Sequence, residues 1–84
     1  MTLLHIGFSN VVFVDKIVAI ISPETAVAKR IRDEAREKKT LIDCTVGRKL
    51  RSMVITDSEY TFLSSIRVEA LIQRLENIKE IKNK

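Results

Sequence analysis

The chain has 84 residues, of which 45% are hydrophobic and 31% charged, and its formal net charge is +4 at pH 7. This length predicts one small domain, near the size at which association often supplies missing burial. One histidine, one cysteine and two glycines exclude a zinc site of the usual ligand count and the glycine motifs of nucleotide binding, so no metal, cofactor or enzyme activity is expected.

Three short β-rich runs open the chain, at residues 3–8, 11–14 and 17–21. Gly7 permits a bend or bulge in the first run, and Ser9 and Asn10 supply a turn after it. The polar pair Asp15 and Lys16 separates the second run from the third, which predicts either a tight hairpin or one strand broken by a bulge. Lys16 lies at a bend in both cases and reaches solvent.

A Ser-Pro-Glu sequence at residues 22–24 predicts the start of a helix, because serine caps, proline suits the first position and glutamate favours the positive dipole end. Apolar residues then follow at helical spacing and predict a core stripe: Val27, Ala28, Ile31 and Ala35. Cations fall on another face: Lys29, Arg32 and Arg36. We interpret that face as solvated, with local ion pairs of Asp33 to Arg36 and to Lys29. Phosphate contact is the alternative.

Residues 41–55 run from an apolar segment through a glycine turn into a second apolar segment rich in β-formers, which predicts a hairpin. Its tip carries three cations, Arg48, Lys49 and Arg51. These charges repel one another and add nothing to a core, so they indicate an anionic partner. The alternative is that they keep a sheet edge soluble, since exposed lysine and arginine block edge-to-edge pairing.

Beyond the hairpin, Asp57 and Ser58 predict a turn and residues 60–64 a further strand. Apolar residues then recur at the spacing of an amphipathic helix: Val68, Leu71, Ile72, Leu75 and Ile78. The order strands, helix, strands, helix predicts a single α+β domain, with a small antiparallel sheet covered by two helices. The turn cations are then expected to gather on one rim: Lys16, Arg48, Lys49 and Arg51.

The remaining reactive side chains suggest packing. His5 lies in an apolar run, where a packed or hydrogen-bonded side chain is favoured over a general base. Cys44 has no activating or disulfide partner and predicts a buried small apolar residue in a reduced, cytoplasmic compartment. The N-terminus lacks the charged region of a signal peptide and no apolar run approaches 18 residues, so we expect neither membrane contact nor secretion.

The charge distribution favours nucleic acid as the partner, with positive charge concentrated on residues 29–39, on the turn tip and on residues 67–84. The four aromatic residues form no aromatic-basic signature, so base stacking on single-stranded RNA has weak support. Cations at loop tips suit duplex phosphates, and Arg48 also reaches a guanine edge. No small-molecule substrate is expected.

Seven segments in order resemble the RemA family of extracellular-matrix regulators from Gram-positive bacteria: His5–Asn10, Ile21–Ala26, Lys29–Arg30, Asp33–Arg36, Leu41–Asp43, Gly47–Lys49 and Leu63–Ser65. The resemblance covers residue 1 to about residue 75, within one RemA-like domain over residues 1–84. Residues 76–84 lie outside it, and we expect a frayed helical tail there.

The resemblance implies a non-enzymatic, DNA-binding transcriptional regulator that activates biofilm matrix and osmoprotection genes. It also implies closed rings of seven or eight subunits, with a surface similar to that of LytTR DNA-binding domains. By position, the family's paired arginines after the glycine are Arg48 and Lys49, and its arginine at the earlier bend is Lys16. Lysine keeps the charge but lacks the bidentate fork, which favours phosphate contact over base reading. An aromatic or histidine position of the family is Val46, and a helix proline is Val27.

Three hypotheses about function follow. In the first, duplex DNA follows the rim of the ring through phosphate contacts, with sequence preference set by how readily DNA curves. Several linked copies then raise the affinity of a weakly binding subunit. In the second, a basic ring acts as a scaffold or adaptor for an acidic protein. RNA binding is the third, and the sparse aromatic residues speak against it.

Overall fold

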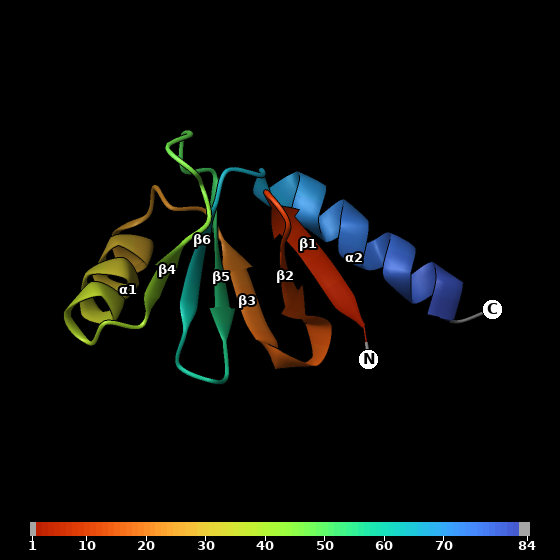
Figure 1. The fold of residues 1–84 in the computed structure, drawn as a ribbon, viewed down its shortest axis with the longest axis horizontal. Helices are drawn as coiled ribbons and strands as arrows, with labels where there is room; N and C mark the ends of the chain where they lie inside the picture. Colours follow the sequence, from red (N-terminus) through yellow and green to blue (C-terminus); the bar gives the residue numbers. More distant parts are fainter. Residues whose placement is uncertain (1, 83–84) are drawn as a thin grey trace.

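The computed structural model describes the backbone of residues 2–82 and the side chains of residues 2–78. Figure 1 shows the strands standing between one helix on each side. The elements in chain order are β1 (Leu3–Gly7), β2 (Asn10–Phe13), the 3-10 turn η1 (Val14–Lys16), β3 (Ile17–Ile21), α1 (Ala26–Glu37), β4 (Leu41–Asp43), β5 (Ser52–Thr56), β6 (Thr61–Ser64) and α2 (Val68–Lys82). The predicted α+β class and order of elements are confirmed.

The strands form two sheets, a two-stranded β1-β2 sheet and a four-stranded sheet in the order β3-β5-β6-β4. Strands β3, β5 and β6 pair antiparallel, with Val54 of β5 opposite Ile20 on one side and Phe62 on the other. Strand β4 pairs with β6 in parallel, from Leu41 opposite Thr61 onward. The four-stranded sheet is therefore mixed, and the prediction of a single antiparallel sheet was wrong.

The predicted hairpin over residues 41–55 is not formed, because β6 lies between β4 and β5. The chain leaves β4 with the Cys44 N–H donating to the Leu63 carbonyl, and it enters β5 with the Arg51 N–H donating to the Ser64 carbonyl, both at 2.9 Å. Three of the four residues of β6 are buried, which explains its central place. The basic turn is thus a loop that crosses one end of β6.

The β1-β2 hairpin contains the predicted bulge, since its register shifts between His5 and Gly7. Its turn residues Phe8 and Ser9 have φ of 49° and 64°, as the two central residues of a type I′ turn do. Strands β2 and β3 form neither of the two predicted arrangements, because η1 carries the chain from one sheet to the other.

Helix α1 is capped by Thr25, whose Oγ1 accepts the Ala28 N–H at 3.1 Å, and not by Ser22 as predicted. Ala28 and Ala35 are buried, but Val27 is 56% exposed, so its predicted place in the core stripe was wrong. A contact of 3.6 Å confirms the expected ion pair of Asp33 with Arg36. The other expected ion pair, Lys29 with Asp33, is not formed among the described side chains.

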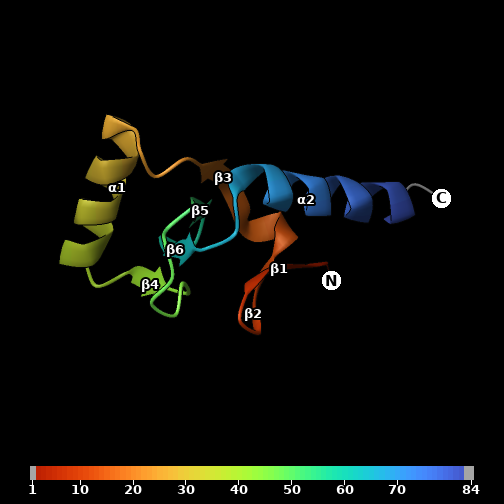
Figure 2. The ribbon, with the colours of Figure 1, turned by 90° about the horizontal axis from the view of Figure 1, so that it is seen from above.

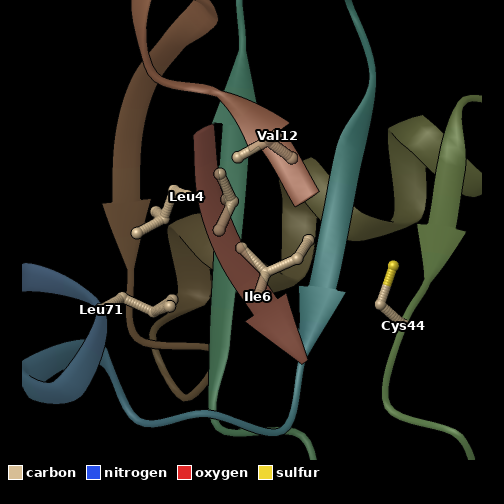
Figure 3. Packing of buried hydrophobic residues seen from close by; sticks show 6 residues of the cluster. Leu4, Ile6, Val12, Cys44 and Leu71 are labelled. Atoms are coloured by element: carbon tan, nitrogen blue, oxygen red, sulfur yellow. The ribbon is translucent and has the colours of Figure 1, made fainter. Parts of the chain in front are cut away.

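The four-stranded sheet is covered on both faces (Figure 2). Successive residues of β5 point to opposite faces, so Met53 packs with Ala28 of α1 while Val54 packs toward the β1-β2 hairpin and α2. Figure 3 shows this second cluster, whose buried members are Leu4, Ile6, Val12, Cys44, Val54 and Leu71. The domain thus has a layer on each side of one central sheet.

Two side chains test the expectations about packing. Cys44 is buried as predicted, and burial, with the nearby Asp43 charge, raises the pKa of its thiol. His5 is exposed between buried Leu4 and Ile6, so of the predicted packed or hydrogen-bonded side chain the packed alternative was wrong. Strand alternation explains this outcome.

Helix α2 forms where predicted and Leu71 is fully buried, but Ile72 is 43% exposed, so its predicted place on the apolar face was wrong. The backbone of α2 continues to Lys82. The expected frayed tail is not tested, and residues 83–84 lie outside the described residues. Neither described helix combines the length and apolar character that a bilayer span requires.

Candidate nucleic-acid interface

Four chain connections lie at one end of the four-stranded sheet, at the upper side of Figure 1. One is the link from β3 to α1, and the other three meet around a single pocket. They are the β1-β2 turn, the loop from β4 to β5 and the link from β6 to α2. Together they line an open pocket of about 530 Å³, formed by Gly7, Phe8, Arg48, Lys49, Arg51, Ser65 and Ile66. We call this region the basic end.

Hydrogen bonds shape the loop from β4 to β5. The Asp43 Oδ1 accepts from the Thr45 N–H at 2.8 Å and from the Thr45 hydroxyl at 2.6 Å. Both bonds lower the pKa of Asp43 below its ordinary value, and the bond from the Thr45 hydroxyl has the larger effect. The Arg48 N–H then donates to the Thr45 carbonyl at 3.0 Å, which closes the turn that presents the cations.

The tip of this loop is strained. Val46 has φ of 52° and Gly47 has φ of 76°, both in the left-handed region. Glycine adopts that region at no cost, but a β-branched residue there is a genuine outlier, and strain of this kind costs about 1–3 kcal/mol. The Val46 side chain is 65% exposed and gains little from packing.

The three cations of the loop are exposed around the pocket: Arg48, Lys49 and Arg51. Among the described side chains the one ion pair is Asp33 with Arg36, so none of the three cations is directly paired with a described carboxylate. The Arg48 guanidinium lies over the Phe8 ring, 5.2 Å from the centroid. An exposed group of unpaired cations beside a hollow suits a phosphate-bearing ligand.

The structure groups no catalytic constellation. Cys44 lies in the core, whereas His5 is exposed on β1. Within the described part of the chain, no three side chains of histidine, cysteine, aspartate or glutamate lie close enough together to hold a metal ion.

Comparison with known proteins decides the family. The family model described as RemA-like, extracellular matrix regulatory protein A-like, matches residues 3–75. The chain belongs to the RemA-like family. This match agrees with the resemblance read from the sequence, which covers residue 1 to about residue 75.

Curated relatives of this RemA-like chain carry the printed name "Putative regulatory protein". One from Thermodesulfovibrio yellowstonii is 43% identical over 81 residues, covering 96% of this chain and 95% of the relative. One from Symbiobacterium thermophilum is 53% identical over 73 residues, covering 87% and 77%. A third, from Thermotoga petrophila, is 50% identical over 80 residues, covering 94% and 87%. Family and names indicate a regulatory protein rather than an enzyme.

The four predicted DNA-binding residues of the RemA-like chain do not share one place. Arg48, Lys49 and Arg51 lie together at the basic end, but Lys16 lies at the opposite end of the sheet, before β3. Its carbonyl accepts the Asp57 N–H at 2.9 Å, beside the turn from β5 to β6. The expectation that all four gather on one rim of the subunit was wrong, because β3 runs away from Lys16 toward the basic end.

Sequence reasoning missed Phe8 and Ser65 as neighbours of the loop cations. Phe8 lies 40 positions from Arg48 in the sequence, and only the stacking of the β1-β2 hairpin on the four-stranded sheet brings them together. The sequence held no local signal for this contact, because residues 3–8 were expected as a strand and the turn was expected at Ser9 and Asn10.

Proposed function

We propose that the protein is a DNA-binding transcriptional regulator that acts as a cyclic homo-oligomer in the cytoplasm and holds duplex DNA through the basic end of each subunit. Membership of the RemA-like family supports activation of biofilm matrix and osmoprotection genes as the biological role. The likeness to LytTR surfaces implied by the sequence belongs to the same proposal. The observation that carries it is the group of exposed, unpaired cations around one pocket: Arg48, Lys49 and Arg51.

Each loop cation has a chemical role in this proposal. Arg48 offers a planar fork that binds a phosphate or a guanine edge through two parallel hydrogen bonds. Lys49 offers a point charge that suits a phosphate oxygen. Arg51, at the start of β5, also lines a second pocket with Arg67 and the carboxylates Glu24 and Glu69, so part of its field is balanced there.

Charge arithmetic explains why several copies are needed. Three phosphate contacts give a slope of about −2.7 in the logarithm of affinity against the logarithm of salt concentration, which means weak binding by one subunit at physiological salt. Linked copies convert later contacts into intramolecular ones and raise the overall affinity without new chemistry. A ring of seven or eight subunits meets this need.

The two edges of the four-stranded sheet support association. Strands β3 and β4 pair on one side only within the described chain, and they carry Val18, 66% exposed, and Ile42, also exposed. An interface between two different edges repeats head to tail and closes into a ring when the rotation per subunit allows it. Apolar residues on free edges are a hazard unless another chain covers them.

Lys16 enters the proposal as a separate DNA contact. The five residues of β3 span about 15 Å, so Lys16 lies at least that far from the basic end and would contact a separate part of the duplex. Asp15 and Asp57 lie near Lys16 and reduce the net field there. We therefore expect Lys16 to contribute less to affinity than Arg48 or Lys49.

The test combines light scattering with DNA retention. The purified chain should scatter light as an oligomer of seven or eight subunits, and a stable monomer contradicts the proposal. A promoter duplex should be retained tightly at low salt and released steeply as salt rises. An oligomer that retains no duplex at low salt supports the adaptor for an acidic protein instead, and preference for single-stranded RNA of equal length supports RNA binding.

A further inference from the structure

Phe8 lies in a place that neither folding nor burial requires. It is the first central residue of the β1-β2 turn, with φ of 49°. Left-handed backbone is costly for an aromatic residue, yet the ring remains 46% exposed. The turn is held by the Asn10 side-chain amide, which donates to the carbonyls of Gly7 at 3.0 Å and Phe8 at 3.2 Å. The turn geometry therefore fixes an aromatic ring outside the core.

What the ring contacts is the guanidinium of Arg48. The Arg48 Cζ lies 5.2 Å from the centroid of the Phe8 ring, within the distance of a cation–π interaction. Phe8 lies in the turn of the two-stranded sheet and Arg48 in a loop of the four-stranded sheet, and both line the same pocket. The side chain that presents the cation and the ring that contacts it are thus fixed by separate parts of the fold.

We propose that Phe8 is a positioning residue for Arg48, holding its guanidinium at the mouth of the pocket so that its N–H donors face a DNA phosphate. This inference rests on the proposed function and names the device that prepares one contact. A ring contacts the cation through its π face and uses none of the five N–H donors of arginine. The full fork therefore stays available to the ligand.

The benefit of this contact is preorganisation. A free arginine side chain samples many rotamers and loses that freedom when it binds. A ring already in contact with the guanidinium removes part of this loss before DNA arrives. Lys49 follows in the same loop with no ring over it among the described side chains, so it lacks such support.

The experiment is a double-mutant cycle between Phe8 and Arg48, read by anisotropy of a labelled duplex at low salt, where Arg48→Ala still binds through its remaining cations. Phe8→Leu removes the ring face but keeps an apolar side chain, and we expect about three- to fivefold weaker binding. Phe8→Trp should restore wild-type affinity. In the Arg48→Ala background, Phe8→Leu should change affinity less than about twofold, roughly the limit of additivity.

Phe13 supplies the matched control, since it is also 46% exposed, lies on β2 of the same hairpin and has no cation over its ring among the described side chains. Phe13→Leu should leave affinity unchanged. A second readout needs no DNA: ring-current shifts of the Arg48 δ-protons should disappear in Phe8→Leu and persist in Phe13→Leu.

The outcomes separate the two proposals. Equal affinity of Phe8→Leu and wild type overturns the positioning role while the DNA-binding proposal stands. The same fold loss in the Arg48→Ala background also overturns it, because the ring then contacts DNA directly. A wild-type oligomer that binds no duplex at low salt overturns both. Urea unfolding of each variant shows whether a loss of binding comes from a loss of folding.

Discussion

The two ends of the four-stranded sheet differ in how their charges are arranged, with cations alone around the pocket at one end and both signs mixed at the other. At the basic end the loop from β4 to β5 presents Arg48, Lys49 and Arg51. At the opposite end, which we call the acidic end after the carboxylates of η1 and of the turn from β5 to β6, Asp15, Asp57 and Glu59 are interspersed with Lys16, Lys38 and Lys39. Because the strands run between these ends, the domain is polarised along the strand direction.

Residues with left-handed backbone are also more frequent at the basic end than at the acidic end. Five residues with positive φ lie at the basic end: Gly7, Phe8, Ser9, Val46 and Gly47. Lys39 and Glu59 are the others, and both lie toward the acidic end. The acidic turn is tied by the Thr56 hydroxyl, which donates to the Tyr60 carbonyl at 2.8 Å. Glycine adopts this region without strain, so the strained residues in the described chain are three at the basic end, Phe8, Ser9 and Val46, against two toward the acidic end.

Removing the two cations at the loop tip gives the largest expected effect. Arg48→Ala with Lys49→Ala should weaken duplex binding at least about 100-fold, because two charge-assisted contacts are lost, and should make the salt slope shallower by about 1.8 for each engaged subunit. Electrophoretic mobility shift measures the loss, and light scattering should find the oligomer mass unchanged.

A matched control separates position from net charge. Arg30→Ala with Lys38→Ala removes one arginine and one lysine from exposed sites on and just beyond α1, so the change in charge is the same. We expect at most about a threefold loss of affinity from the weaker overall field. Equal losses in the two double variants would show that the polarity of the sheet has no role in binding.

Side-chain hydrogen bonds at the two ends of the sheet should contribute differently to the free energy of unfolding. The buried Ser64 hydroxyl donates to the Ile6 carbonyl at 2.7 Å and accepts the Ile66 N–H at 3.1 Å, joining the hairpin to the basic end. Ser64→Ala leaves both groups without partners and should cost about 1–3 kcal/mol of unfolding free energy. Thr56→Val at the acidic turn should cost only about 0.5–1 kcal/mol, because water reaches exposed Tyr60.

Urea unfolding measures both variants, with the slope against denaturant concentration as the check on two-state behaviour. A Thr56→Val protein as destabilised as Ser64→Ala would contradict the view that the hairpin is fastened mainly at the basic end.

Relief of strain should act in the opposite direction. Val46→Asn places a residue that tolerates left-handed backbone at the loop tip and should stabilise the fold by about 1 kcal/mol. Glu59→Asn at the acidic end is the matched control, with a smaller expected gain because glutamate is not β-branched. Thermal unfolding measures both, and a destabilised Val46→Asn protein would show that the valine side chain makes a contact the fold needs.

The smallest expected effect is on how the free energy of unfolding depends on pH, and it concerns Asp43 at the basic end. The pKa of Asp43 is lowered in the folded state by the Thr45 hydroxyl and N–H, so its contribution to stability is complete above the ordinary value of 3.8. That contribution is lost as pH falls through the lower folded pKa. Thr45→Val should therefore flatten the fall in unfolding free energy between about pH 5 and about pH 2. Thr56→Val should leave this pH dependence unchanged, because the Thr56 hydroxyl forms no hydrogen bond with a carboxylate.

Local patterns predicted most of the elements. The β-branched run 17–21 and the apolar spacing of residues 68–78 gave β3 and α2, and the glycine at position 7 gave the bulge of β1. The burial of Cys44 followed from its apolar surroundings. These features depend on neighbours within one or two turns of the chain, which is the range that periodicity covers.

The errors came from contacts between distant segments. Residues 41–55 read as a hairpin because neighbouring strands usually pair, but the buried strand β6 enters between them. Lys16 was grouped with the loop cations because sequence shows a turn without showing at which end of the sheet it lies. The contact of Phe8 with Arg48 depends on packing of two sheets, for which the sequence holds no local signal.

The central claim is that duplex DNA lies against the basic end, and lysine footprinting tests it most directly. The oligomer is modified with an amine-reactive reagent with and without a promoter duplex, and each lysine is quantified by mass spectrometry. We expect strong protection of Lys49 by DNA and little change at Lys29 and Lys38, which are exposed on and just beyond α1. Unchanged modification of Lys49 in a complex that shields Lys29 and Lys38 would contradict the account.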